Sequence, residues 1–593
     1  MQPLRRRVIK RPGQLIAVSL VTLGIVAAAC GGDNSSSSPT TTAGGTATTA
    51  AGGATTTAGG GAATTASPAT TAAATTTTAA KPTAGGKITV RVEAEVGNPW
   101  EPANMNCDTA CQTRARTFYD SLLAFDTNGK PQPYLAESVT PSADFQTWTI
   151  KLRPNITFTD GTPLNSDAVI ENLERARKSA LLGPYVRDIS GETKVDDLTT
   201  TVTLSRPWVT FDVAMTTQVG FMASPTWLKA ADADPSKASQ PVGTGPFVVA
   251  SYTPGDTLVV KKNPNYWRKA EGLPYLDEID FKVIQDSLTA ANAFKAGQLD
   301  VEVDTNGQNI KDFRADKSIN YTEQKEHGET IYILLHVGQD GSPLQDQDVR
   351  CGLTAATDSK TIVEATQAGV PQVANGPFSP GQQGYLDQPG NQTYDPAKAK
   401  QLISQWSAAH GGQKPKFALS TTPDATSLQI AQVLQQAWND AGADVSINQI
   451  EQSKYITTAL LGDPSFQAFE WRNHAGFVLD NQNIWWNSDF AQPEGQVALN
   501  FGRLKDPAID QALNDAHGNP DAAASKADAE AVNKEFAKQC WLIPLYWAIW
   551  GIASKSNVQG IGTGTFPTGQ TGTLYDGQSF PGQIWWQQVW LKQ

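Results

Sequence analysis

The chain has 593 residues, of which 39% are hydrophobic and 18% charged, and its formal net charge is -12 at pH 7. A chain of this length exceeds one ordinary domain, and its composition is that of a globular protein. The excess of acidic groups argues against nucleic acid or an anionic lipid surface as a partner.

The first thirty residues have the pattern of an export signal. Basic residues between positions 5 and 11 precede an apolar stretch at 15–29, which is shorter than the ~20 residues of a membrane span. This pattern is typical of a secretory signal peptide. The sequence AAAC at 27–30 resembles a bacterial lipobox, so we expect residues 1–29 to be a signal peptide and Cys30 to be lipidated, anchoring the chain to the cell membrane. Ordinary cleavage and an uncleaved anchor remain alternatives.

Residues 30–86 have the composition of a linker. After Cys30 this segment consists almost entirely of Ala, Thr, Gly, Ser and Pro. Few large apolar side chains are present to offset the entropy lost on ordering it. We therefore expect a lipidated cysteine followed by a disordered tether, which O-linked sugars on its threonines could stiffen.

Four further cysteines are candidates for disulfides, because exported chains favour oxidised cysteines. Three pairings are possible. The short loop between Cys107 and Cys111 is the favoured one, which leaves Cys351 with Cys540. A CxxxC pair could instead bind a metal, but two cysteines without a nearby histidine make a poor site. The five histidines also lack metal-site spacing, so no metal site is predicted.

The folded part begins with alternating apolar and polar residues, which are typical of strands. Such runs occur at 88–96, 148–152, 201–204, 257–261 and 279–283. Ser166 is the expected N-cap of a helix between them. The chain before about residue 340 is therefore predicted to be rich in strands and mixed in pattern.

From residue 287 onward helices and strands alternate. Helices are predicted at 287–296, 396–410, 426–442 and 453–461, and strands at 298–303, 416–420, 444–450 and 465–471. This order favours a largely parallel sheet with helices on its faces. Because such sheets bind ligands at the carboxyl ends of their strands, two lobes side by side would form a cleft.

Several segments, taken in order, resemble one family. They are YDSLLAFDTNGKPQPYLAES (119–138), the stretch 148–177 with FTDGTPLNSDAV, VGTGPFVVASYTPGDTLVVKKNPNYW (242–267), AFKAGQLDVEV (293–303) and DVRCGLTAATDSKTIV (348–363). They resemble the large extracytoplasmic solute-binding proteins of ABC importers, a class that includes oligopeptide-, dipeptide- and nickel-binding proteins. The resemblance implies a two-lobed α/β fold of the class II periplasmic-binding-protein type, with an extra subdomain inserted in the first lobe.

The resemblance also implies domain boundaries. Lobe I would contain residues 87–125, 242–336 and 546–593, the inserted subdomain 126–241, and lobe II 337–545. The chain would cross between the lobes near 336–339 and again near 544–547.

The segment 469–490 supplies most of the candidate ligand contacts. It is rich in tryptophan, and exposed tryptophans either pack in a core or line a cleft. The resemblance places Trp471, His474 and Trp485 in the cleft. A structural role in the core remains the alternative for each of them.

In peptide-binding members of the family, an acidic residue in this region pairs with the α-amino group of the ligand. Here Asn473, also a candidate ligand contact, and His474 stand after Trp471 and Arg472, and the next acid is Asp480. Asp480 could serve as this acid or could cap a nearby helix. Asn375, in the turn sequence NGPFSP, is a further candidate because such turns expose backbone groups to polar ligands.

The sequence thus predicts a binding protein and not an enzyme. GxSxG, HExxH and P-loop motifs do not occur in it, and no cofactor is expected. The protein would be a monomer outside the cytoplasm that delivers a peptide or another polar organic solute to an ABC permease. A surface receptor or adhesin with the same fold is the alternative.

Overall fold

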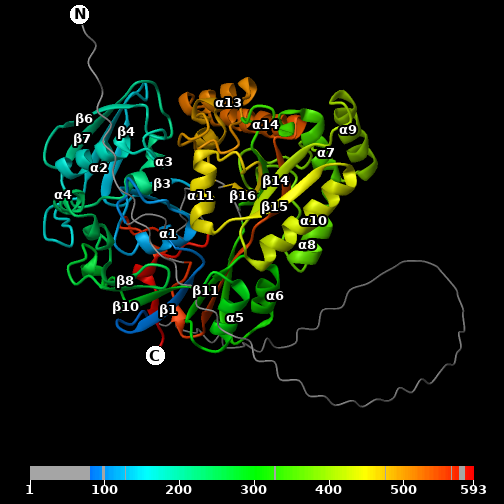
Figure 1. Cartoon of the computed structure of the whole chain (residues 1–593). Helices are drawn as coiled ribbons and strands as arrows, with labels where there is room; N and C mark the ends of the chain where they lie inside the picture. Colours follow the sequence, from blue (N-terminus) through cyan, green and yellow to red (C-terminus); the bar gives the residue numbers. More distant parts are fainter. Residues whose placement is uncertain are drawn as a thin grey trace, which may run out of the picture. The chain divides into compact units, whose positions relative to one another are not determined.

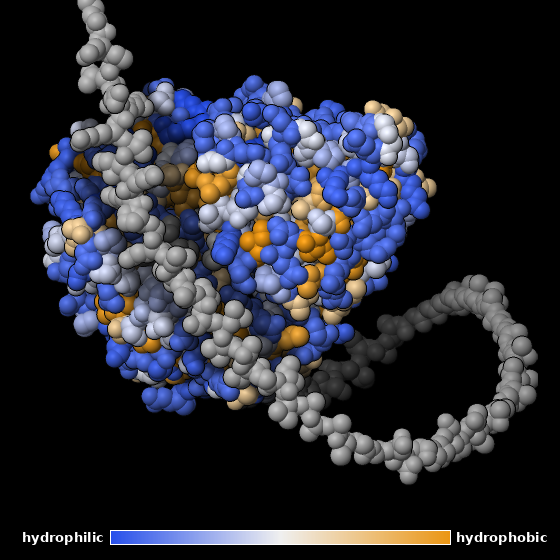
Figure 2. Space-filling model, viewed as in Figure 1, coloured by the Kyte–Doolittle hydropathy of each residue, from blue (hydrophilic) through white to orange (hydrophobic). Residues whose placement is uncertain are grey.

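The computed structural model describes residues 81–95, 100–126, 128–325, 329–473, 476–562, 564–572 and 581–593. The predicted signal peptide, Cys30 and most of the linker lie outside these residues, as does His474. Within the described ranges no helix is both long and apolar enough to cross a bilayer. The face seen in Figure 2 is mostly hydrophilic, with small apolar patches.

Lobe I is built on a mixed sheet with the strand order β12-β18-β11-β1-β10-β9-β8 (Figure 1). Its strands are β1 (Lys87–Val92), β8 (Phe247–Thr253), β9 (Thr257–Lys262), β10 (Glu278–Val283), β11 (Val301–Asp304), β12 (Ile319–Gln324) and β18 (Trp550–Lys555). The central strand β1 runs parallel to β10 and β11. As its alternation predicts, Ile88, Val90 and Val92 are buried in the core of this lobe.

Helices and short strand pairs complete lobe I. The helices are α1 (Thr109–Ala115), α5 (Ser287–Lys295) and α6 (Gly307–Ala315). The pairs are β2 (Leu123–Phe125) with β3 (Pro131–Pro133), β19 (Val558–Gln559) with β22 (Trp590–Leu591), and β20 (Gly564–Thr565) with β21 (Thr571–Gly572).

A separate antiparallel sheet, with the order β4-β5-β7-β6, is inserted between β3 and β8. It contains β4 (Ala136–Pro141), β5 (Thr147–Leu152), β6 (Ile189–Lys194) and β7 (Thr199–Leu204), and its helices are α2 (Ser166–Lys178), α3 (Phe211–Ala214) and α4 (Pro225–Ala233). The N-cap of α2 is Asn165 and not Ser166, because the Asn165 side chain accepts a hydrogen bond from the Ala168 amide at 3.0 Å. The Ser166 hydroxyl instead donates to the Asp196 carbonyl at 2.6 Å.

Lobe II has a sheet with the order β15-β14-β16-β13-β17. Its strands are β13 (Thr330–Leu335), β14 (Lys416–Thr421), β15 (Asp444–Gln449), β16 (Ala468–Asn473) and β17 (Leu542–Trp547). The neighbours β15, β14 and β16 are parallel, and β13 runs antiparallel to β16 and β17. The helices are α7 (Gln347–Ala356), α8 (Ser359–Thr366), α9 (Pro396–Ala409), α10 (Ala425–Ala441), α11 (Gln452–Leu461), α12 (Asn483–Trp486), α13 (Pro507–Gly518) and α14 (Ala522–Gln539).

The structure corrects the position at which the chain crosses between the sheets. β13 belongs to the second sheet, where it pairs with both β16 and β17, although the expected boundary placed it in lobe I. The first crossing therefore lies between β12 and β13, and the second between Trp547 of β17 and Trp550 of β18. The physical reason is that β13 is a buried apolar strand that needs a neighbour on each edge.

Candidate functional site

A cavity of about 580 Å³ lies between residues of the two lobes. The segments directly after β14 and β15, with Asp424 and Glu451, and the end of β16, with Arg472, line it on the lobe II side. This is the edge at which an open α/β sheet presents its loops to a ligand. Residues from the end of β1 and from the inserted subdomain, such as Glu93 and Tyr185, form the opposite side.

Aromatic side chains form one wall of this cavity. Trp471 and Trp485 both line it, as do Tyr455 and Phe501. The Trp471 ring lies parallel to Tyr455 with a centroid distance of 6.0 Å and 4.7 Å from Phe501, while Trp485 is 5.4 Å from Phe501. Each tryptophan is partly exposed and also packs against the hydrophobic cores. The arrangement gives a rigid apolar surface beside polar groups, which suits a small organic solute.

Asp480 lies elsewhere, in a buried contact between lobe II and the inserted subdomain. It is 4% exposed and does not line the cavity. Its carboxylate accepts hydrogen bonds from the Trp208 indole at 2.9 Å and the Thr210 hydroxyl at 2.5 Å, and it lies 2.8 Å from His517. The prediction that Asp480 contacts the ligand is therefore not supported by its position, because the inserted subdomain covers it.

Asn375 also lies away from the cavity lining. Its amide nitrogen donates to the carbonyl oxygens of Leu386 at 2.9 Å and Asp387 at 2.8 Å, so it ties together a loop of lobe II. Asn473 is the last residue of β16 and is paired with Thr330 in the sheet. His474 follows it, outside the described residues.

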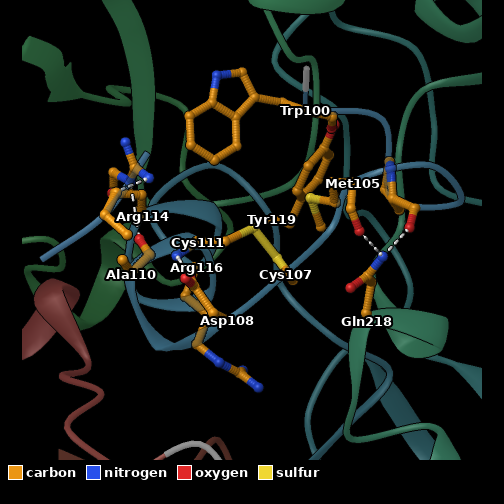
Figure 3. Close-up of a disulfide and its surroundings, with 12 residues drawn as sticks. Trp100, Met105, Cys107, Asp108, Ala110, Cys111, Arg114, Arg116, Tyr119 and Gln218 are labelled. Atoms are coloured by element: carbon orange, nitrogen blue, oxygen red, sulfur yellow. Dashed lines mark hydrogen bonds between the residues drawn. A yellow bond between two sulfur atoms is a disulfide. The ribbon is translucent and has the colours of Figure 1, made fainter. Parts of the chain in front are cut away.

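Two disulfides join the four cysteines in the favoured pairing, Cys107 with Cys111 and Cys351 with Cys540. The first closes the loop at the start of α1 (Figure 3), and Cys107 lines the cavity. The amide of Gln218, from the inserted subdomain, donates to the carbonyls of Pro102 and Met105 at 2.5 and 2.9 Å. The short disulfide loop is thereby held in place at the edge of the cavity.

Arg472 is a central residue of the site that the sequence did not single out as a ligand contact. Its guanidinium lies 3.5 Å from Glu93 of lobe I and 3.9 Å from Glu329, over the ring of Trp550. Burial raises the pKa of Glu93, and Arg472 opposes that rise. Because β16 alternates, Arg472 lies on the opposite face of the strand from Trp471. This ion pair links the two lobes in the lining of the cavity.

Glu470 is the second residue that the sequence did not reveal. It lies two positions before Arg472 on β16 and lines the cavity near Asp424. Burial, followed by the charge of Asp424, raises the pKa of Glu470 to about 7. Glu470 and Asp424 are far apart in the chain, so sequence spacing alone gave no sign that both line one cavity. Among the described residues, no group of three or more His, Cys, Asp and Glu side chains is arranged to hold a metal ion.

Residues 130–507 match the family model of bacterial extracellular solute-binding proteins, family 5. The chain is 29% identical over 357 residues to the glutathione-binding protein GsiB of Shigella flexneri, covering 59% of this chain and 67% of that protein. It is 29% identical over 393 residues to the nickel-binding periplasmic protein of Escherichia coli (strain K12), covering 62% and 72%.

The fold is also that of solved binding proteins. The oligopeptide-binding protein AppA from Bacillus subtilis, solved with a nonapeptide, superposes with a TM-score of 0.74 at 21% identity, covering 86% of this chain and 100% of that one. DppA from Helicobacter pylori, in complex with the peptide STSA, gives a TM-score of 0.74 at 20% identity, covering 86% and 99%. The two-lobed α/β architecture and the family match over more than half of the sequence lead to one conclusion: the chain belongs to the family 5 bacterial extracellular solute-binding proteins.

Proposed function

We propose that this protein is the lipid-anchored substrate-binding component of an ABC importer. It captures a peptide or another polar organic solute between its lobes and delivers it to a membrane permease. The observation that carries this proposal is the cavity of about 580 Å³ at the carboxyl ends of the lobe II strands, with aromatic side chains on one side. The named ligands of similar proteins, which include glutathione, nickel and peptides, support a small polar cargo.

The anchoring part of the proposal rests on Cys30, the residue after the apolar N-terminal stretch. A diacylated cysteine contributes ~0.8 kcal/mol for each methylene that enters the bilayer, which is enough for stable attachment. Expression of the full chain with Cys30→Ala should yield protein that partitions into the aqueous phase of a detergent extraction. Partitioning and mass identical to the wild type would contradict lipidation.

Solute capture is tested by thermal shift with a panel of peptides, sugars and metal chelates. A ligand at 100 times its Kd stabilises the folded chain by ~2.7 kcal/mol, which gives a clear rise in melting temperature. Because Trp471 and Trp485 line the cavity, Trp471→Ala and Trp485→Ala should weaken binding about tenfold or more, as aromatic contacts and buried area are lost.

The matched control is Trp406→Ala, because Trp406 stacks on His410 at the end of α9 and does not line the cavity. It should leave the affinity within about twofold of the wild type. Unchanged affinity in both cavity variants would place the binding site elsewhere.

A further inference from the structure

The cavity between the lobes is strongly acidic. Among the described residues, two guanidinium groups line it, those of Arg91 and Arg472. Seven described carboxylates line it as well, those of Glu93, Asp108, Asp286, Glu329, Asp424, Glu451 and Glu470. A concave surface with an excess of one charge attracts solutes of the opposite sign. The question is which of these carboxylates already has a positive partner within the protein.

Most of them do. Arg472 lies between Glu93 and Glu329. Asp108, Asp286 and Asp424 are the N-caps of α1, α5 and α10, and each accepts a hydrogen bond from a backbone N–H of its helix. The positive end of a helix dipole favours a carboxylate at that position. Each of these five carboxylates therefore already has a favourable partner within the protein.

Arg91 is not available to balance the remaining acids. It is 2% exposed, and its guanidinium donates to the carbonyl oxygens of Ile284 at 2.8 Å, Val303 at 2.6 Å and Gln285 at 3.2 Å. Its hydrogen-bonding capacity serves backbone segments of lobe I. What remains is Glu470, whose charge Arg472 opposes only in part and whose carboxylate also accepts a hydrogen bond from the Ser427 side chain. The exposed Glu451 at the start of α11 also remains, and it makes no side-chain cap hydrogen bond.

Glu470 also has an atom without a partner. Its Oε2 is enclosed and makes no hydrogen bond with the protein. A second unpartnered group lines the same cavity: Asn481 is 7% exposed, and its Nδ2 makes no hydrogen bond. Burying such groups without partners is unfavourable, and a bound molecule that pairs with them removes this penalty. One acceptor and one donor thus remain for a bound molecule.

Tyr455 connects this polar pair with the aromatic wall. Its hydroxyl donates to the backbone carbonyls of Ser420 at 3.0 Å and Glu470 at 2.9 Å, and its ring lies parallel to Trp471. A cation near Glu470 would therefore also lie beside aromatic faces, which attract positive charge.

Resting on the proposed function, we infer that the solute is an organic cation whose ammonium or guanidinium group contacts Glu470 beside Asp424. The apolar or aromatic part of the solute lies along Trp471 and Tyr455. An oxygen of the solute accepts a hydrogen bond from Asn481. Arg472 and the hydroxyls of Tyr455 and Tyr546 are the other titratable groups near Glu470. A bound cation stabilises the ionised form of Glu470, so binding at neutral pH releases a proton.

The experiment uses three dipeptides with acetylated and amidated ends, so that only the side-chain charge differs: Phe-Arg, Phe-citrulline and Phe-Glu. Calorimetry on the full folded chain should give Phe-Arg a Kd about tenfold or more below that of neutral Phe-citrulline, with Phe-Glu weakest. Because the pKa of Glu470 is about 7, this preference should increase from pH 6 to pH 8.

Variants assign the preference to the two carboxylates. Glu470→Gln and Asp424→Asn keep the shape of the side chain, and Asn remains a good N-cap for α10. Each should bring Phe-Arg and Phe-citrulline to within about threefold of one another. The matched control Glu174→Gln removes an exposed carboxylate on α2 that pairs with Lys178, and it should retain the full preference.

Two outcomes would overturn the inference. If Phe-citrulline or Phe-Glu binds as tightly as Phe-Arg, the solute is not selected for positive charge, while capture of a solute stands because binding itself is measured. If the preference for Phe-Arg persists in both Glu470→Gln and Asp424→Asn, the cation is received by other groups. Failure of solute capture has a separate signature, which is that no member of the thermal-shift panel stabilises the wild-type chain.

Discussion

At the scale of single residues, His517 of α13 stands out by its surroundings. Its Nδ1 lies 2.8 Å from Asp480 and its Nε2 3.2 Å from Asp188, while its ring stacks on Trp208. Burial lowers the pKa of His517, but Asp480 and Asp188, against a weaker opposing charge on Arg206, raise it to about 9. The ring is therefore a buried cation at neutral pH that joins lobe II to the inserted subdomain.

We expect His517→Gln to destabilise the folded chain by about 3 kcal/mol at pH 7, since two buried carboxylates lose their cation. The folded pKa lies above the ordinary value of 6.5, so this contribution is complete below about pH 6.5 and is lost as pH rises through about 9. In urea unfolding, the difference in the free energy of unfolding between wild type and variant should decrease from pH 7 to pH 10.

The control is His410→Gln at the exposed end of α9, which should change stability by less than about 0.5 kcal/mol. The difference in the free energy of unfolding between wild type and His517→Gln could instead stay constant over this pH range. That result would mean that the ring stabilises the protein by packing alone.

At the scale of elements, a disulfide joins two helices of lobe II. Cys351 lies in α7 and Cys540 is the C-cap of α14, and 189 positions separate them. The other disulfide spans a sequence separation of only 4. A crosslink stabilises a protein mainly by restricting the unfolded chain, and it does so more for long loops.

Replacing both Cys351 and Cys540 by serine should therefore lower the free energy of unfolding by about 2–4 kcal/mol. The matched variant, with Cys107 and Cys111 replaced by serine, should lose less, because its loop is short. Urea unfolding without reductant gives both values. Equal losses in the two variants would refute loop closure as the source of the difference.

At the scale of the whole folded part, the site depends on two sheets joined by two crossings. The ion pair of Arg472 with Glu93 spans the lobes, and the cavity takes its lining from both. Two lobes connected in this way can rotate about the crossings, as hinged binding domains do when they close on a ligand.

A solute that binds with micromolar or better affinity should therefore reduce the radius of gyration measured by small-angle X-ray scattering of residues 81–593, because closure brings the lobes together. The double variant Trp471→Ala and Trp485→Ala, at the same solute concentration, serves as the control and should remain expanded. An unchanged radius of gyration under saturation with a confirmed ligand would contradict hinge closure.

Local signals in the sequence were sufficient for many elements. Alternation predicted β9 and β10, and the helix predicted at 396–410 is α9, whose N-cap Asp395 accepts from the Ala397 amide at 3.0 Å. Gly442 ends α10 with φ +113°, a conformation that favours glycine. These features depend on neighbours within a few residues, so they can be read from sequence alone.

The sequence determined the family and most helices and strands, and the family resemblance pointed to Trp471 and Trp485, which line the cavity. Only the tertiary structure decided the sheet to which β13 belongs, the burial of Asp480 under the inserted subdomain, and the presence of Glu470 and Asp424 in one cavity. In each case the partner lies in a distant part of the chain. Local sequence patterns indicate which residues are buried. Contacts between residues distant in the chain are determined only when the lobes pack, and this packing brings the charged groups together in the cavity.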